Sequence, residues 1–175
     1  MFTFSISAQP VEQALAAFQG ALRDARPALQ EIADDFREMI AAQFASEGRA
    51  GGTPWAPLAP STLRRRGSAS PILFDSGALF RSLHDAGAPG HIEQIEDQAL
   101  VLGTNLPYAL FHQTGTGWGL GQDQSSRSRR GRGLPMRPIV VLSPDRQDAW
   151  AEILQRGLEE RTRVLEGPEL GGPGP

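Results

Sequence analysis

The sequence predicts an α+β domain in which a small antiparallel sheet of about four strands packs against N-terminal helices and a C-terminal helix. Apolar and polar residues alternate over residues 2–7, which is typical of a half-buried strand. Apolar residues then recur at helical spacing between residues 10 and 46, and again after residue 144. Helical runs at both ends argue against a doubly wound parallel sheet.

The N-terminal helical pattern has two parts, separated at Pro27. The first follows Pro10, and its apolar stripe is Val11, Leu15, Phe18 and Leu22. The second runs to about Ser46, and its stripe is Leu29, Ile32, Phe36, Ile40 and Phe44. We therefore expect either two helices or one long helix with a kink near Pro27.

The middle of the chain combines loops with short helices. Gly48 to Pro60 predicts a loop whose only large apolar groups are Trp55 and Leu58. A short helix over residues 62–66, capped by Ser61, should follow. Asp75 or Ser76 should cap a second one over residues 77–83, with Leu79, Phe80 and Leu83 facing inward.

Three further strands are expected in the second half. Residues 92–96 and 99–102 predict a hairpin that turns at Asp97-Gln98, and residues 138–142 predict another strand. Ser143-Pro144-Asp145 then has the cap, proline and acid of a helix start. The apolar face of that helix should comprise Trp150, Ile153, Leu154, Leu158 and Leu165.

Residues 103–115 predict a rigid corner between these strands. Pro107 suits the first turn of a short helix, on which Tyr108, Phe111 and His112 share a face. Gly115 should end that helix in a left-handed conformation.

A Gly- and Arg-rich arm, residues 117–133, follows the corner. A structureless loop of this length is uncommon inside a compact domain. Its basic residues are Arg127, Arg129, Arg130 and Arg132. We expect a domain over residues 1–166 with this flexible arm, and a disordered Gly/Pro tail over residues 167–175.

Composition excludes several classes of protein. The net charge of −3 argues against a dedicated nucleic-acid binder, and the absence of cysteine excludes disulfides and thiolate metal sites. The N-terminus lacks the pattern of a signal peptide, and no apolar stretch approaches the roughly 18 residues of a membrane span. We expect no cofactor and no membrane contact.

No catalytic constellation stands out. Ser82, His84 and Asp85 lie too near one another on one helix end to converge on a reacting atom. The three histidines lack the i, i+4 spacing of a helical zinc pair. The paired carboxylates, including Asp34-Asp35, fall on predicted solvent faces.

The order and spacing of several short motifs carry more information. The series is GGTPWAPL (51–58), LRRR (63–66), ILFDSGAL (72–79) with Ser82, Gly103 with YALFHQTG (108–115), and LPMRP (134–138). It resembles the phage virion morphogenesis family, the tail-completion proteins of Mu-like and related tailed phages. The matching motifs span roughly residues 44–142, more than half of the chain, and the Arg/Ser/Gly arm departs from the pattern.

The resemblance implies a structural virion protein and no enzymatic activity. It implies a ring subunit at the head–tail neck or upper tail, made in the bacterial host cytoplasm, with six subunits as the expected number. The implied partners are other copies, other neck, connector and tail proteins, and packaged DNA in the lumen. The expected interface and loop anchors are Trp55, Leu58, Leu73, Gly77, Leu79, Tyr108, His112, Gly115, Arg137 and Pro138.

Two alternatives stay open. A tail terminator or a head-closure protein would fit the same motifs. A nucleic-acid-binding accessory protein would use the arginines of the arm together with Arg64, Arg65 and Arg66. Its affinity would fall steeply with salt, because phosphate contacts release counterions.

Overall fold

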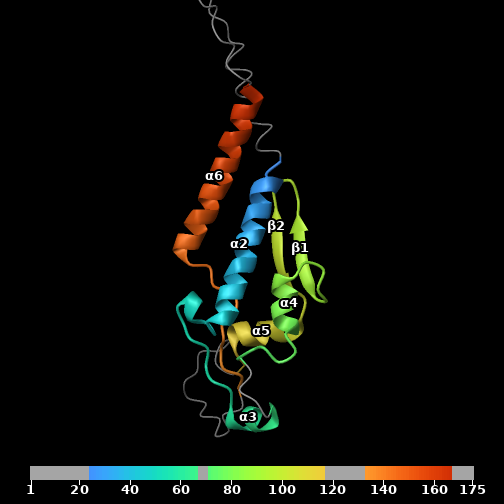
Figure 1. Cartoon of the computed structure of the whole chain (residues 1–175), viewed down its shortest axis with the longest axis vertical. Helices are drawn as coiled ribbons and strands as arrows, with labels where there is room; N and C mark the ends of the chain where they lie inside the picture. The colour runs from blue at the N-terminus through green and yellow to red at the C-terminus, as the bar shows by residue number, and fades with distance from the viewer. Residues whose placement is uncertain (1–23, 67–70, 117–132, 167–175) are drawn as a thin grey trace, which may run out of the picture. The chain divides into compact units, whose positions relative to one another are not determined.

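The computed structural model describes residues 24–66, 71–116 and 133–166, which form an α+β structure (Figure 1). Five α-helices and one two-stranded antiparallel sheet occur in these ranges. The expected count of four strands is not supported. The strand and first helix expected before residue 23, the arm from 117 to 132 and the tail from 167 lie outside the described residues.

The chain groups into two compact units, and helix α2 (Arg26–Ala45) contributes to both. The first unit contains described residues 24–32, 95–100 and 145–166. The second contains described residues 33–66, 71–94, 101–116 and 133–144. The expected helix after Pro27 is confirmed, and its predicted stripe is buried from Leu29 to Phe44.

In the first unit, the start of α2 packs against helix α6 (Pro144–Glu166). The two helices approach closely at Gly157, where an added Cβ would lie 3.0 Å from the Ala28 methyl group. Arg156 forms an ion pair with Glu31. The start of α6 at Pro144 is confirmed, and Ile153, Leu154 and Leu158 of its predicted face are half-buried.

The second unit has an aromatic centre. The Phe44 ring meets Trp55 and Phe80 edge-on, at centroid distances of 5.2 and 5.3 Å. Helix α4 (Ala78–His84) adds the buried side chains Leu79 and Leu83, as predicted. Its N-cap, however, is Gly77 in a left-handed conformation, and Ser76 accepts a hydrogen bond from the Ala78 N–H instead of capping in the usual place.

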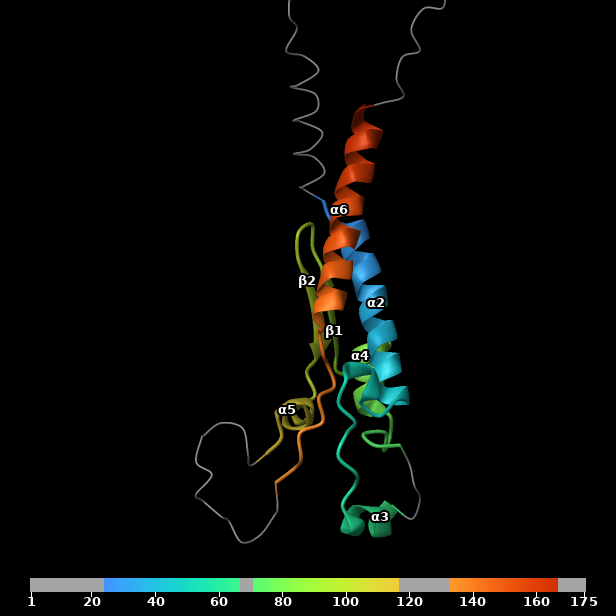
Figure 2. The ribbon, with the colours of Figure 1, turned by 90° about the vertical axis from the view of Figure 1, so that its left-hand side faces the viewer.

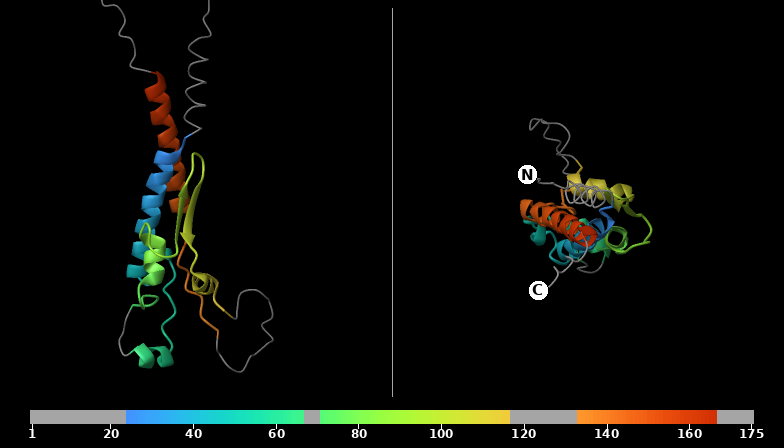
Figure 3. Two further views of the ribbon diagram at one scale, coloured as in Figure 1. Left: turned by 90° about the vertical axis from the view of Figure 1, so that its right-hand side faces the viewer. Right: turned by 90° about the horizontal axis from the view of Figure 1, so that it is seen from above.

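The hairpin is confirmed as strands β1 (His91–Ile95) and β2 (Leu100–Thr104), which lie side by side in Figure 3. The Glu96 N–H donates to the Ala99 carbonyl at 2.8 Å, which closes a two-residue turn at Asp97-Gln98. Two more short elements complete the fold, the 3-10 helix η1 (Arg49–Gly51) and helix α3 (Pro60–Arg66). Helix α3 begins at Pro60, so the prediction that Ser61 caps it is wrong.

The expected strand at residues 138–142 is wrong. Among the described residues this segment pairs with no strand, because side chains bind its backbone groups in place of a neighbouring strand. It runs past helix α5 (Pro107–Thr114) in Figure 2. Sequence periodicity identified an apolar extended segment here, but periodicity does not specify which groups pair with its backbone.

Candidate functional site

Helix α5 is fixed at its start by a short chain of hydroxyl groups. The Leu106 N–H donates to the Thr104 Oγ1 at 3.1 Å. The Thr104 hydroxyl in turn donates to the Ser82 Oγ at 2.9 Å, and the Ser82 hydroxyl donates to the Leu79 carbonyl. The corner predicted at Pro107 therefore rests on helix α4 through buried polar groups.

One side chain of α5 binds three backbone groups of the 138–142 segment. The Gln113 Oε1 accepts from the N–H groups of Ile139 and Val140, at 2.8 and 3.1 Å. The Gln113 Nε2 donates to the Val140 carbonyl at 2.9 Å. Since Ile139 is only 2% exposed, this amide supplies partners that water cannot easily replace.

A second set of polar contacts holds the loop after α2. The Pro138 carbonyl accepts from both the Trp55 Nε1 and the Gln43 Nε2 at 2.8 Å. The other end of the Gln43 amide accepts from the Gly51 N–H at 2.7 Å. The predicted tether residue Trp55 is 5% exposed, whereas Leu58 is only half-buried.

Arg137 connects the same loop to α5. Its Nε and Nη2 donate to the carbonyls of Ala56 and Pro57, at 2.8 and 3.0 Å. Its backbone N–H donates to the His112 carbonyl at 2.7 Å. Arg137 is 4% exposed and, among the described residues, forms no ion pair with a carboxylate. Burial lowers the pKa of its guanidinium below the ordinary value, because a charge is costly away from water.

His112 lies beside this buried cation. Burial first, and the charge of Arg137 second, lower the pKa of its imidazole. Its Nδ1 atom is buried and has no hydrogen-bond partner in the described part of the chain. A buried polar atom without a partner is uncommon in native structures, so this edge of α5 is suited to a further contact.

These side chains border a groove of about 800 Å³ in the second unit, which we call the arginine groove. Seven of the ten expected anchors line it: Leu58, Leu73, Gly77, Leu79, Tyr108, His112 and Arg137. Trp55 and Pro138 are joined by the hydrogen bond described above. Gly115 ends α5 against the segment 134–136, as the Thr116 N–H donates to the Leu134 carbonyl at 2.9 Å.

Backbone strain occurs at the edge of this groove. Leu73 has φ 62° and Glu47 has φ 50°, and they are the non-glycine residues with positive φ in the described ranges. The Glu47 carboxylate accepts from the Ile72 N–H at 3.0 Å, which holds the strained turn at Leu73 against the loop after α2. Strain of this kind persists only where surrounding contacts enforce it.

Helix α3 brings part of the arginine run to the same groove. Arg65 and Arg66 line it, while Arg64 is exposed and does not. Arg66 Nε lies 3.2 Å from the Asp75 carboxylate, and its Nη1 is buried with no partner among the described residues. The run is therefore split, and does not form one open cationic face. The arginines of the arm lie outside the described residues.

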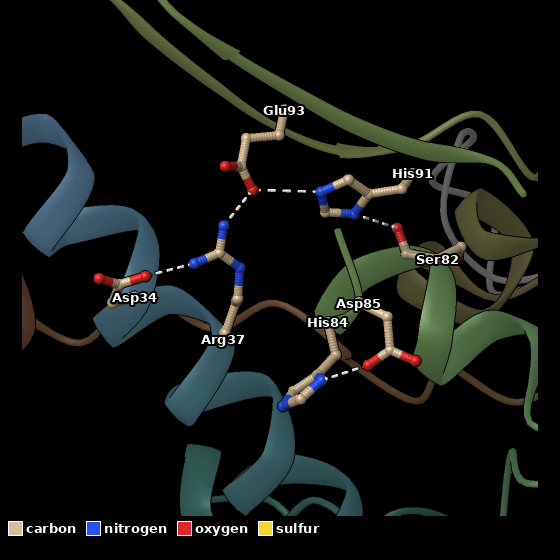
Figure 4. Close-up of polar contacts among 7 residues, drawn as sticks. All are labelled: Asp34, Arg37, Ser82, His84, Asp85, His91 and Glu93. Carbon is tan, nitrogen blue, oxygen red and sulfur yellow. Dashed lines mark hydrogen bonds and ion pairs between the residues drawn. The ribbon is translucent and has the colours of Figure 1, made fainter. Parts of the chain in front are cut away.

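A second polar cluster lies between α2, α4 and β1 (Figure 4). Glu93 forms an ion pair with Arg37 and accepts from the His91 Nε2 at 3.2 Å. Burial alone would raise the pKa of Glu93, but the hydrogen bonds from Arg37 and His91 outweigh it, and the pKa lies below its ordinary value. This cluster ties the hairpin to α2.

Ser82, His84 and Asp85 are not arranged as a catalytic triad. The His84 Nδ1 lies 2.6 Å from the Asp85 carboxylate, but the Ser82 hydroxyl bonds to Leu79 and Thr104 and to neither ring (Figure 4). The His91 Nδ1 lies 3.1 Å from the Ser82 backbone carbonyl, so this ring bonds to the Ser82 backbone and not to its hydroxyl. Within the described ranges, no three His, Asp or Glu side chains lie close enough to hold a metal ion.

The sequence predictions missed the glutamines that organise this site. Gln43 is 3% exposed and lies on the apolar face of α2 between Ile40 and Phe44. A polar residue on a predicted apolar stripe was the available signal, because a buried amide must find hydrogen-bond partners. Gln113 carried no such signal, because α5 has no fully buried face on which a polar residue would stand out.

These hydrogen bonds hold the loops in place while apolar side chains remain exposed. Such an arrangement is typical of a protein that binds other proteins. A model of the phage virion morphogenesis family matches residues 6–159, most of the chain. The chain therefore belongs to the phage virion morphogenesis family. Membership supports a structural role in the phage virion or its tail. No curated protein and no solved structure matches the chain significantly. None of the described helices is both long and apolar enough to cross a bilayer.

Proposed function

We propose that this protein is a ring subunit at the head–tail neck or upper tail, which completes the tail and joins it to the head. The family supports the virion role. The proposal of a ring rests on the surface of the chain, because a ring subunit needs rigid patches that fit a neighbouring copy. A ring closes when one patch of a subunit meets a different patch of the next.

The exposed apolar surface around α5 carries this proposal. Leu110 and Phe111 of α5 are 62% and 49% exposed, and Met136 of the adjoining segment is 57% exposed. The backbone beneath them is fixed by the Gln113 amide and by the bond between His112 and Arg137. Exposed large apolar side chains on a rigid support are typical of a protein–protein interface.

The ring is tested by the mass of the purified chain in solution, measured by light scattering over a range of concentrations. Wild-type protein should associate, and a Leu110→Ser, Phe111→Ser double variant should remain monomeric while keeping its fold. The control is Val101→Ser on β2, which removes a 50% exposed apolar side chain away from α5. Equal association of all three proteins would contradict the proposed interface.

The position is tested in phage particles grown without this protein. Tail completion predicts filled heads and unattached tails, which should join when purified protein is added. Tails of uncontrolled length would instead indicate a terminator, and heads that lose DNA would indicate head closure. Normal infectious particles, or antibody label away from the neck and tail, would contradict the proposal.

A further inference from the structure

We infer that the arginine groove binds carboxylates on helix α6 of a neighbouring copy of this chain. This inference rests on the proposed ring and names two further surfaces that would meet in it, beside the apolar surface of α5. The groove belongs to the second unit and the carboxylates to the first, so the contact is of the head-to-tail kind that builds rings.

The groove has an excess of positive charge that the described residues do not neutralise. Arg65, Arg66 and Arg137 line it against one carboxylate, Asp75. Arg137 is almost fully buried, and within the described part of the chain carbonyl oxygens alone accept its side-chain hydrogen bonds. A buried charge without a counter-ion is costly, so an incoming anion is favoured.

Unused hydrogen-bonding atoms point to the same conclusion. Arg66 Nη1 and His112 Nδ1 are buried and have no partner in the described part of the chain. Both residues border the groove, and a neutral imidazole can carry its proton on Nδ1. A carboxylate accepts several hydrogen bonds at once and would satisfy such donors.

Helix α6 presents matching carboxylates. Asp145, Asp148 and Glu152 are exposed and fall on one helical face at i, i+3 and i+7. No hydrogen bond or ion pair joins the side chains of Asp145 and Asp148 to the described residues, whereas Glu152 lies within electrostatic reach of Arg156. We call these three residues the acidic stripe.

A protein carboxylate fits the groove better than a DNA phosphate. The guanidinium of Arg137 is buried, so a side chain can reach it more easily than the wide backbone of a duplex can. The chain as a whole is also acidic, with a net charge of −3. Charge complementarity between two surfaces of one chain would favour association in a single register.

Charge exchange gives the first test. Arg65→Glu in the groove and Asp148→Arg in the stripe should each raise the concentration needed for association by about tenfold or more, while the double variant should recover most of the wild-type behaviour. Matched controls are Arg64→Glu, beside the groove on α3, and Glu38→Arg, exposed on α2. Neither control should change association by more than about threefold.

Cross-linking in particles gives the second test, because the chain has no cysteine of its own. Particles are grown with Arg65→Cys, Asp148→Cys protein as their only source of this chain and then oxidised. The inference predicts covalent dimers and larger ladders, which Arg64→Cys, Glu38→Cys protein should not form.

The outcomes separate this inference from the proposed function. A chain that is present in particles but gives only monomers, or a charge-exchange pair without recovery, would overturn the contact and leave the virion role intact. Loss of DNA retention in Arg65→Glu that Asp148→Arg does not restore would assign the groove to phosphate instead. Wild-type protein missing from particles would overturn the proposed function itself.

Discussion

Some single side chains in this protein supply the hydrogen bonds to backbone groups that a neighbouring strand would supply in a sheet. Trp55 fills the aromatic centre beside Phe44 and also donates to the Pro138 carbonyl. The Gly48 backbone lies so close to the indole that an added Cβ would come within 2.5 Å of it. The tryptophan and the glycine therefore define one fitted contact, which secures the loop after α2.

Trp55→Ala should lower the free energy of unfolding by about 3–5 kcal/mol, since it removes a buried aromatic side chain. Trp55→Phe should keep most of the packing and cost less, because it mainly loses the bond to Pro138 at about 1 kcal/mol. Urea unfolding at one protein concentration measures both. An alanine variant with wild-type stability would show that Trp55 is not a tether.

His112 should make stability depend on pH. Its pKa is lowered in the folded chain by burial and by Arg137, below the ordinary 6.5 of an unfolded histidine. The unfolded chain then binds the proton more readily, so stability is full above pH 6.5 and falls as the pH drops toward the folded pKa. His112→Gln should remove this part of the dependence. Unfolding curves of the two proteins that stay parallel from pH 7.5 to about 5 would contradict the assignment.

At the scale of elements, an irregular segment replaces an expected strand because α5 presents an amide to it. Gln113→Leu would leave the N–H of Ile139 and its neighbours without partners, and should cost about 1–3 kcal/mol. Gln94→Leu makes the same chemical change at an exposed position of β1 and should be nearly neutral. Equal stability of the two variants, measured by urea unfolding, would mean that water replaces the amide.

The end of α5 depends on a glycine, although not in the predicted way. Gly115 has the expected positive φ of 75°, but its ψ of 164° is extended rather than left-handed helical. Only glycine readily adopts this region. An added Cβ would also lie 3.1 Å from the Leu134 carbonyl oxygen.

Gly115→Ala should therefore destabilise the fold by more than about 1 kcal/mol, and Gly115→Val by more still. Gly103→Ala in β2 is the control, because its Cβ would meet nothing within 4 Å and its φ is not positive. That change should be neutral or slightly stabilising. Thermal unfolding of the three variants separates the effects, and a tolerated valine at 115 would contradict this account.

At the scale of the whole molecule, the arginines of the arm remain a prediction from sequence. We expect the arm to be mobile in the free subunit and to become ordered in the neck beside an acidic partner or DNA. Replacing Arg127, Arg129, Arg130 and Arg132 together by Ser should lower the titre of infectious particles without unfolding the subunit. Single Arg→Ala changes should be nearly silent, because exposed ionic contacts are individually weak.

Amide hydrogen exchange compares the arm in free protein and in whole particles. Slow exchange in particles alone is the expected result. Fast exchange in both states would show that the arm never becomes ordered, and the predicted partner would then have to be abandoned.

Local patterns in the sequence were enough to predict the elements that depend on neighbours along the chain. Helical periodicity identified the stripe of α2, Pro144 marked the start of α6, and alternation with a two-residue turn identified the hairpin. The motif series also identified the family that the comparison shows. These features are local, because they arise from side-chain spacing and backbone preferences within a few residues.

The pairing of backbone groups over long separations could be seen only in the folded chain. The segment 138–142 has the composition of a strand, yet Gln113, Gln43 and Trp55 bind its backbone across 26 to 95 residues of sequence. The same long-range packing buries Arg137 against two carbonyl groups. It also places Arg65 and Arg66, but not Arg64, along a groove. Burial and hydrogen-bond partners depend on distant segments, whose positions no local pattern encodes.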